Sequence, residues 1–367
     1  MSRKFSAPIM IAWFQALKPY ERHLSAAAMV GGFAFDSVSY GRLDHPVTQT
    51  LLLVYLVAAA GSIVVLHYLH VKPESEGFAA KLRGYLPAVT QFAFGSLWSA
   101  FLVFYARSGV LAASWPFLLI LAGIFIGNEV FRAYHSRLVF TSVLLFFALL
   151  SYAIFMMPML TRNIGTVTFL LSGIAAMAVF FLFLRLLNWV SAARLGEVRW
   201  QVALGALAVF VTVNGLYFLN VLPPLPLALQ KAGVFHSVKR LGPVYYAMTE
   251  PQSWNVYLGI PPVLHVEPGE PVFVYSAVFA PIKLSTRVFH RWQRYDDVKR
   301  QWVTKQSPSF AITGGRDNGY RGYTKRTGPE PGLWRVDIDS VDGRLIGRTQ
   351  FMVVEGHVVS NLTTVMN

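Results

Sequence analysis

The chain has 367 residues, of which 54% are hydrophobic and 14% are charged, and its formal net charge is +14. A soluble domain averages about 25% charged residues, so the composition excludes a disordered chain and argues against an ordinary soluble globule. The sequence contains no cysteine, which excludes disulfides, thiolate metal sites and a cysteine nucleophile. No HExxH, GxSxG or Walker motif is present, and we expect no cofactor.

Residues 1–23 are expected to form a cytoplasmic or interfacial N-terminus. Arg3 and Lys4 are not followed by a long apolar run, so this segment does not resemble a cleaved signal peptide. Residues 10–17 (MIAWFQAL) predict a short amphipathic stretch that lies at the membrane interface.

Residues 24–222 predict an α-helical integral membrane bundle of about seven transmembrane helices. A bilayer core about 30 Å thick requires roughly 20 apolar residues in a helix, and seven runs approach or reach that length. The first run is short and contains Asp36, and Pro116 lies in the first turns of the fourth. The seven runs are 24–40, 50–69, 86–105, 111–127, 138–160, 166–184 and 202–222.

The distribution of Lys and Arg predicts the orientation of these spans, because positive residues collect in cytoplasmic loops. With the N-terminus inside, the outside loops hold Arg42, Arg107 and Arg162. The inside segments hold Arg3, Lys4, Lys18, Arg22, Lys72, Lys81, Arg83, Arg132, Arg137, Arg185, Arg194 and Arg199. Seven spans then place the C-terminus outside, so we expect a multi-pass membrane protein with a cytoplasmic N-terminus and an exported C-terminal domain.

The chain changes character after the seventh run. Residues 223–268 predict a Pro-rich exit and a connector, in which 236–240 and 244–248 are candidates for a strand or short helix. Residues 269–367 predict an exported, Ig-like, all-β sandwich domain, because short strands are separated by turn residues. The predicted strands are 271–279, 286–295, 309–312, 320–325, 333–341 and 345–354.

The last two predicted strands are joined by Asp342-Gly343, which is a strong hairpin signal. Trp334 and Val336 alternate with Arg335 and Asp337, so one face of this strand is expected to be buried.

A resemblance to a known family rests on residues of this C-terminal part. Trp292, the segment Gly332-Leu-Trp334-Arg-Val336, Asp342-Gly343 and Phe351-Met-Val353 form a pattern that resembles the bacterial domain of unknown function 2914. Upstream segments such as LPPLPLALQKAGVFHSV and QFAFGSLWSAFLVFYARSG resemble multi-spanning membrane proteins that end in this domain. The resemblance implies an architecture and implies no catalytic residues.

Four polar residues within the predicted spans are candidates for function, since polar groups in a bilayer are costly. They are Asp36, Gln91, Glu129 and Asn214. Each also has a structural explanation: hydration near the interface for Asp36, an ion pair with Arg132 for Glu129, and interhelical hydrogen bonds for the two amides.

His67 and His70 lie on one helical face and form a weak candidate for a metal site. No third ligand is fixed by their spacing, and an interfacial pair without metal is the stronger interpretation. We therefore expect no metal.

The basic and aromatic run from Arg287 to Tyr295 is the main candidate in the C-terminal domain. The candidate binding-surface residues are Arg291, Trp292, Arg294, Tyr295 and Arg321. They predict a surface that binds an envelope protein, a glycan or an anionic lipid. In the alternative interpretation Trp292 belongs to the core and the arginines solvate the outer face. Nucleic acid is not expected as a partner.

Three functions follow from these patterns. In the leading hypothesis the chain lies in the inner membrane of a bacterial envelope, as the resemblance implies, and its helices anchor an exported, periplasmic β-sandwich that binds an envelope component or a partner protein. In the second, the bundle is a transporter or lipid flippase that uses the polar residues within the spans. In the third, Asp36, Asp44 and His45 belong to an intramembrane enzyme that acts on a lipid-linked substrate. An enzyme is the less favoured class, because no catalytic motif is present.

Overall fold

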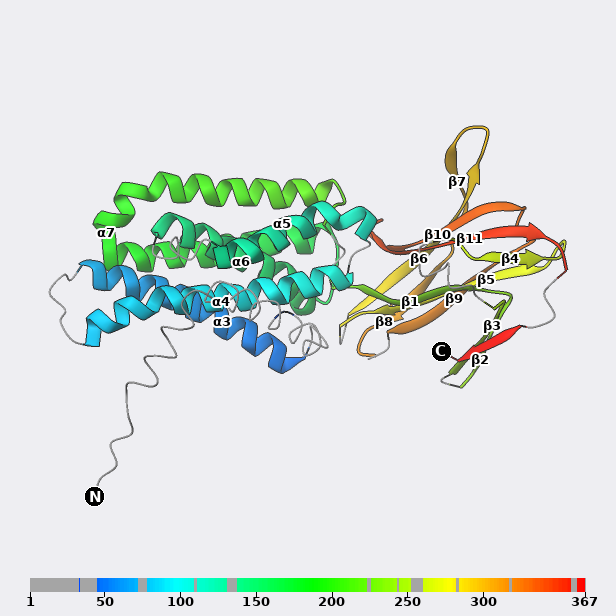
Figure 1. Cartoon of the computed structure of the whole chain (residues 1–367), viewed down its shortest axis with the longest axis horizontal. Helices are drawn as coiled ribbons and strands as arrows, with labels where there is room; N and C mark the ends of the chain where they lie inside the picture. Colours follow the sequence, from blue (N-terminus) through cyan, green and yellow to red (C-terminus); the bar gives the residue numbers. More distant parts are fainter. Residues whose placement is uncertain are drawn as a thin grey trace, which may run out of the picture.

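The structure is a computed structural model with helices at one end and strands at the other (Figure 1). It describes residue 33 and residues 45–71, 78–108, 111–130, 137–222, 226–242, 244–251, 260–281, 284–316, 319–357 and 362–366. The part formed by strands β1 to β12, residues 228–366, is called the β domain below.

Five helices make up the described part of the bundle. They are α3 (Pro46–Val71), α4 (Phe78–Ser108), α5 (Leu111–Val130), α6 (Leu138–Thr161) and α7 (Thr166–Phe218). Four of them, all except α5, are long and apolar enough to cross a membrane, and α5 contains the shorter apolar stretch Ser114–Asn128. Helices suit such a sequence because they satisfy every backbone polar group internally. The chain is therefore a membrane-associated helical protein with a β domain at its C-terminus.

The structure does not support seven separate spans. The run at 24–40 lies outside the described residues except for Phe33, whose ring centroid is 5.7 Å from that of Phe125 in α5. The runs at 166–184 and 202–222 belong largely to the single 53-residue helix α7, in which only Ser191 leaves helical geometry. Residues 185–201 were expected to form a loop because of their arginines, but Leu, Ala, Arg and Glu are also strong helix formers.

Helix α7 turns back on itself at Ser191 to form two antiparallel arms (Figure 1). The rings of Phe169 in the first arm and Tyr217 in the second are 3.5 Å apart between centroids. The Tyr217 hydroxyl also donates a hydrogen bond of 3.5 Å to the Thr166 hydroxyl. The beginning and the end of α7 therefore lie together, at the end of the bundle that faces the β domain.

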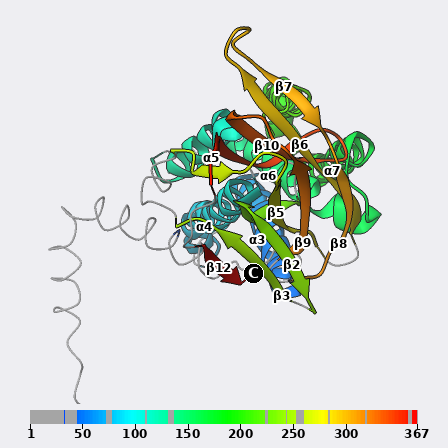
Figure 2. The ribbon, with the colours of Figure 1, turned by 90° about the vertical axis from the view of Figure 1, so that its right-hand side faces the viewer.

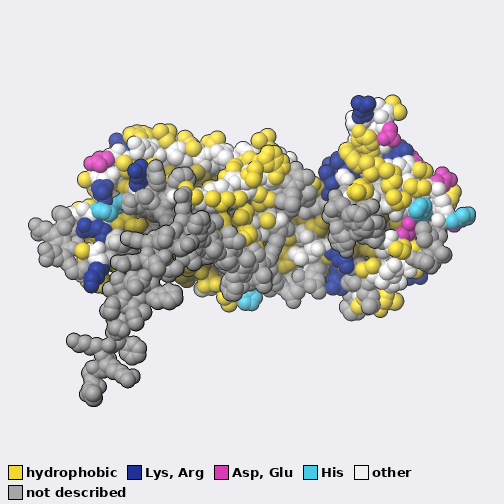
Figure 3. Space-filling view, viewed as in Figure 1, with side chains coloured by type: hydrophobic (Ala, Val, Ile, Leu, Met, Phe, Trp, Pro, Cys, Tyr) yellow, Lys and Arg dark blue, Asp and Glu magenta, His cyan; other side chains and the backbone are white. Residues whose placement is uncertain are grey.

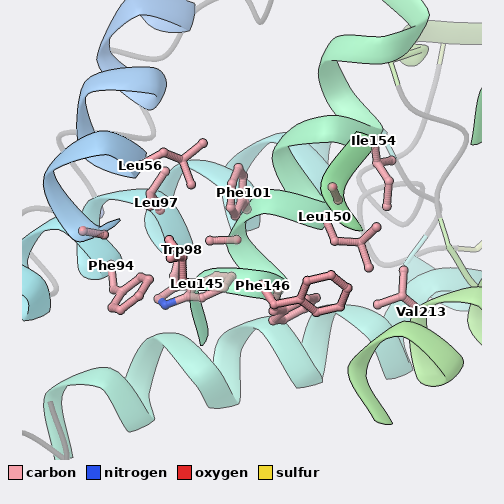
Figure 4. Close-up of a cluster of buried hydrophobic side chains, with 14 of the residues drawn as sticks. Leu56, Phe94, Leu97, Trp98, Phe101, Leu145, Phe146, Leu150, Ile154 and Val213 are labelled. Carbon is pink, nitrogen blue, oxygen red and sulfur yellow. The ribbon is translucent and has the colours of Figure 1, made fainter. Parts of the chain in front are cut away.

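The interior of the bundle is packed with aromatic side chains from α4, α6 and α7 (Figure 4). Trp98 stacks on Phe147 with ring centroids 5.1 Å apart, and the Phe146 and Phe180 rings are 5.0 Å apart. Large apolar side chains are also exposed on the outside of the helices, including Val57, Leu119, Ile174, Phe181 and Leu207. A bundle that is apolar both inside and outside is suited to lipid rather than water.

A glycine in the second arm of α7 allows this arm to pack closely against α6. A Cβ atom at Gly205 would lie 2.5 Å from Cγ2 of Val143, a β-branched side chain that is stiff in a helix. Gly215, on the same arm, has no atom within 4 Å of the equivalent position.

We therefore expect opposite effects from two identical substitutions in this arm. Gly205→Ala should lower the free energy of unfolding by about 1–2 kcal/mol through overpacking. Gly215→Ala should raise it by up to about 1 kcal/mol through helix propensity. Thermal unfolding of both variants in detergent measures this, and equal shifts would show that Gly205 is not a packing contact.

The described part of the β domain contains twelve strands in three sheets. The strands are β1 (Ala228–Phe235), β2 (Ser237–Leu241), β3 (Val244–Thr249), β4 (Val263–Val266), β5 (Pro271–Phe279), β6 (Ser285–Asp296), β7 (Gln301–Gln306), β8 (Ser309–Thr313), β9 (Tyr320–Thr327), β10 (Gly332–Ser340), β11 (Leu345–Glu355) and β12 (Thr363–Met366). The sheet orders are β1-β5-β9, β4-β11-β10-β6-β7 with β8 also paired to β6, and β12-β3-β2. Residues 228–266, expected to be a connector, thus supply strands to all three sheets.

The first two sheets enclose the core of the β domain (Figures 1 and 2). Val272 and Val274 of β5 pack with Trp334 and Val336 of β10, and all four are completely buried. The hairpin predicted at Asp342-Gly343 is confirmed, because β10 and β11 pair in antiparallel register around it. Gly343 has φ +77°, a conformation that glycine adopts without strain.

Candidate functional site

Strand β6 carries most of the residues predicted to form a binding surface, and it alternates between core and exterior. Trp292 is completely buried, and its indole Nε1 donates a hydrogen bond of 3.0 Å to Thr324 Oγ1. Arg291 and Arg294, in contrast, are partly exposed. Trp292 therefore belongs to the core, as in the alternative interpretation, and only the outward residues of β6 can contact a partner.

A buried polar network crosses the core next to Trp292. His290 Nε2 lies 2.8 Å from Ser276 Oγ, and its Nδ1 lies 2.9 Å from Thr324 Oγ1. Burial lowers the pKa of His290 to about 3, so its imidazole is neutral at physiological pH. A Ser–His pair can act in nucleophilic catalysis, but both residues are completely buried, so no substrate can reach them. The pair is a structural network that the sequence analysis did not identify.

The outer face of β6, β10 and β11 carries a network of ion pairs. Arg291 Nε lies 2.9 Å from Asp339 Oδ2, and Arg348 Nη2 donates a hydrogen bond of 3.0 Å to Asp337 Oδ2. Burial raises the pKa of Asp339 to about 6, although the adjacent Arg291 guanidinium acts in the opposite direction. Arg291 is therefore held in place by carboxylates, so its charge is largely neutralised.

The hairpin of β6 and β7 projects from the β domain beyond the outline of the helices (Figures 1 and 2). The rings of Tyr295 and Trp302 meet edge to face with centroids 5.2 Å apart, and the Arg335 guanidinium lies 4.3 Å from the Trp302 ring centroid. At the tip, Val298 is 93% exposed. These four residues, Tyr295, Val298, Trp302 and Arg335, are called the hairpin patch.

Neither of the two remaining arginines predicted for this surface belongs to the hairpin patch: Arg294 contacts Pro331 and Glu330, and Arg321 lies in another sheet. Arg294 donates a hydrogen bond of 2.8 Å to the Pro331 carbonyl and lies 3.4 Å from Glu330. Arg321 lies on β9 in the opposite sheet, where its carbonyl accepts a hydrogen bond of 3.2 Å from the Tyr245 hydroxyl. The structure thus brings Tyr295 together with Trp302 and Arg335, two residues that the sequence analysis did not select.

A second titratable cluster joins the third sheet to β4. The Glu250 carboxylate lies 3.0 Å from His236 Nε2 and 2.9 Å from His265 Nδ1, and it accepts the His265 backbone N–H at 2.7 Å. Burial would raise the pKa of Glu250, but these hydrogen bonds outweigh burial and lower it. These contacts hold the third sheet against β4, and no residue spacing in the sequence predicted them.

The polar residues predicted for the membrane part lie in different places. Gln91 is half-buried on α4, where its backbone carbonyl accepts a hydrogen bond of 3.0 Å from the side-chain amide of Asn128 in α5. Asn214 lies on the second arm of α7 and donates to the carbonyl of Phe210 within the same helix, at 2.8 Å. Asp36 and the side chain of Glu129 lie outside the described residues.

The residues considered for intramembrane catalysis and metal binding can be placed only in part. His45 is exposed before α3, and Asp44 lies outside the described residues. The rings of His67 and His70 are 5.9 Å apart, but His70 Nδ1 contacts the Leu66 carbonyl at 2.8 Å and the Arg194 guanidinium lies 3.4 Å from His67 Nδ1. In the described ranges no group of three His, Asp or Glu side chains is arranged to hold a metal ion.

The β domain is docked on the helices through the turn between β10 and β11. Arg344 is only 6% exposed, and its Nη2 donates a hydrogen bond of 3.1 Å to the carbonyl of Tyr217 near the end of α7. Its guanidinium lies 3.2 Å from the Tyr217 ring centroid, and its Nε pairs with Asp342 at 3.0 Å. Ile164, from the turn between α6 and α7, packs against the apolar cluster of β-domain residues that includes Leu284 and Ile338.

Comparison with known proteins identifies one family in this chain. Residues 285–353 match the family described as Protein of unknown function (DUF2914), so the C-terminal region contains this domain. The matched range begins with β6 and ends in β11, and it includes the outer ion pairs and the hairpin patch. No curated protein matches the chain significantly.

Solved structures add no functional information. A β-glucosidase from Listeria innocua in complex with gluconolactone is 15% identical with a TM-score of 0.19, and the match covers 34% of this chain and 18% of that protein. The alkylpurine DNA glycosylase AlkC from Pseudomonas fluorescens is 11% identical with a TM-score of 0.22, over 83% of this chain and 98% of that protein. This chain therefore spans less than a fifth of the glucosidase, and both TM-scores are too low to indicate a shared fold.

Proposed function

We propose that this chain is a multi-pass inner-membrane protein of the bacterial envelope whose helices hold the β domain at the exported surface, where the hairpin patch binds a partner protein. The observation that carries this proposal is the projecting hairpin. Its tip residue Val298 is 93% exposed beside an edge-to-face Tyr–Trp pair and a stacked arginine.

The proposed orientation rests on the positions of the basic loops. Lys and Arg side chains gather at the end of the bundle that lies away from the β domain (Figure 3). This end carries the bend of α7, with Arg185, Arg194 and Arg199 around Ser191. Each arm of α7 has roughly 25 residues and a length of about 37 Å at 1.5 Å per residue, enough to cross a bilayer core of about 30 Å. By the positive-inside rule, this arrangement supports a β domain that lies outside.

The composition of the hairpin patch favours a protein partner. Trp, Tyr and Arg are the residues that most often carry the binding energy of protein interfaces. Trp302 is also held by Arg335 and Tyr295, so little side-chain freedom would be lost on binding. Val298 adds an apolar contact that has no partner within the described part of the chain.

The transport hypothesis receives less support from the membrane part. The backbone carbonyl of Gln91 accepts from Asn128 of α5, whereas the side-chain amide of Asn214 donates within its own helix α7, so these contacts do not bring the two residues together. The bundle interior shown in Figure 4 is filled by aromatic and aliphatic side chains.

A photo-crosslinking amino acid at position 298 of the full chain tests the proposed binding role in cells. We expect a discrete crosslinked adduct from the protein that carries the crosslinker at position 298. The adduct should be lost when the same protein also carries Trp302→Ala. The matched control carries the crosslinker at Leu241, which is 64% exposed on β2. An adduct that forms equally at 241, or that survives Trp302→Ala unchanged, would contradict the hairpin patch as the binding surface.

A further inference from the structure

Basic side chains gather at the end of the β domain that contacts the helices (Figure 3). The proximal end is the end that contacts the helices, and it contains the turn with Arg344 and the cluster around Ile164. Lys and Arg side chains gather on the side of the β domain nearest the helices, whereas the projecting hairpin carries both basic and acidic side chains and further Asp and Glu lie toward the far side (Figure 3). The carboxylates of the far end include Glu267, Glu270, Glu330 and Glu355.

Three arginines at the proximal end are exposed. Arg162 ends α6, two residues before Ile164. Arg287 on β6 precedes the buried Val288, which belongs to the same apolar cluster as Ile164. Arg316 follows Gly315, whose N–H donates to the carbonyl of Ala280 in that cluster. All three therefore lie close to the junction between the β domain and the helix ends.

These three arginines are not neutralised by the carboxylates of the proximal end. Asp342 pairs with Arg344, and Asp339 pairs with Arg291. Among the described residues, Arg162, Arg287 and Arg316 have no ion-pair partner, and Arg316 stacks on the Tyr320 ring at 4.6 Å. The described part of the proximal end thus retains three exposed arginines without an ion-pair partner.

We propose that Arg162, Arg287 and Arg316 form a basic collar that binds anionic lipid headgroups of the leaflet next to the β domain. The collar lies close to the ends of helices that are long and apolar enough to cross a bilayer. The ends of such helices lie at the depth of the lipid phosphate groups. Each Arg near an anionic membrane surface contributes about 1 kcal/mol, or about fivefold in affinity. This inference rests on the membrane placement in the proposed function, but it is independent of the hairpin patch.

A headgroup-quenching experiment on the full chain tests the collar. Because the chain has no cysteine, Ser285→Cys on exposed β6 gives a single site for a fluorophore near the collar. The labelled protein is reconstituted in phosphatidylcholine nanodiscs, and quenching by headgroup spin-labelled phosphatidylglycerol is compared with quenching by the phosphatidylcholine analogue. We expect phosphatidylglycerol to associate more strongly, by about fivefold for each arginine engaged.

The variants separate charge from structure. Arg162→Gln, Arg287→Gln and Arg316→Gln together should abolish the preference for phosphatidylglycerol, whereas the corresponding three Arg→Lys substitutions should retain it. The matched control, Lys299→Gln, Arg300→Gln and Lys325→Gln, removes the same charge from exposed sites at the far end and should leave the preference unchanged. Millimolar inorganic phosphate should not abolish it, since membrane charge rather than a single phosphate is recognised.

Three results would overturn the collar: an unchanged preference in the Gln variant, an equal loss in the far-end control, or a loss in the Lys variant. Competition by free phosphate would reassign the arginines to a soluble anion. Loss of crosslinking at position 298 with an intact lipid preference would instead remove the proposed partner site and leave the collar standing.

Discussion

Replacing Arg344 with alanine should detach the β domain from the helices and lower the stability of the junction by about 3 kcal/mol. The side chain is almost fully buried, donates to the Tyr217 carbonyl and pairs with Asp342. Its removal leaves a buried carbonyl and a carboxylate without their partner, and breaking a buried ion pair typically costs about 3–5 kcal/mol. We take the lower end because Asp342 retains partial exposure and the Ser340 hydroxyl as a donor.

A spin label at the junction measures this effect. Val341→Cys places the label on the β10–β11 turn, where Val341 is 51% exposed. In the Arg344→Ala background we expect the spectrum to change from immobilised to mobile, and chymotrypsin should cut the chain faster between α7 and β1, where the linker contains leucines but no Lys or Arg. Arg240→Ala is the control, since Arg240 also stacks on a tyrosine but is exposed and lies outside the junction. An immobilised label and unchanged cleavage in Arg344→Ala would show that this contact does not hold the two parts together.

Replacing His290 with leucine should destabilise the β domain by about 3 kcal/mol at neutral pH. Ser276 and Thr324 each lose a buried hydrogen-bond partner, and each unsatisfied buried group costs about 1–3 kcal/mol. The apolar replacement recovers part of this cost through burial. Urea unfolding of the full chain, followed by tryptophan fluorescence, reports the change because Trp292 and Trp334 lie in the same core.

The same substitution should also change the dependence of stability on pH. Burial lowers the pKa of His290 from its ordinary 6.5 to about 3 in the folded state, so the unfolded state binds the extra proton. The wild type therefore loses stability from this group as the pH falls below 6.5, at about 1.4 kcal/mol per unit. The stability difference between wild type and His290→Leu should shrink at that rate between pH 6.5 and 4.

Asp339 provides the control with the opposite sign. Its pKa is raised from 3.8 to about 6 in the folded state, so the folded state binds the extra proton. The wild type consequently loses stability from this group as the pH rises from 3.8 through 6. Asp339→Asn should remove this loss, whereas His290→Leu should not. A stability difference for His290→Leu that is constant between pH 6.5 and 4 would show that His290 is not held neutral by burial.

The helices and most strands of the matched domain could be predicted because their signals are local. Apolar runs predicted the positions of α3, α4, α5 and α6, and alternating residues predicted β5, β6, β10 and β11. The bend of α7 at Ser191 lies within the expected break at 185–201, but the loop expected there was wrong, because a count of arginines marks a membrane boundary and does not end a helix. Strands β2 and β3 were weakly indicated because their pattern is partly polar and their sheet is completed by the distant β12.

The contacts that define the candidate sites depend on tertiary structure and had no signal in the sequence. Arg344 and Tyr217 are separated by 127 residues, and nothing near either residue indicates the other. Trp302 became a surface candidate only once β7 was seen to pair with β6 and bring it to Tyr295. Conversely, Trp292 was ambiguous in sequence because both faces of its strand carry aromatic residues, and packing decided its direction.

The central claim is that the helices cross a membrane and place the β domain on the side opposite to the bend of α7. Because the chain has no cysteine, single substitutions Val298→Cys and Glu197→Cys give unique probes at two exposed positions, the hairpin tip and the α7 bend. Labelling with a membrane-impermeant maleimide should modify position 298 once the outer membrane is permeabilised, and position 197 only after the inner membrane is opened. Labelling of both positions before the inner membrane is opened, or of position 197 alone, would contradict this topology.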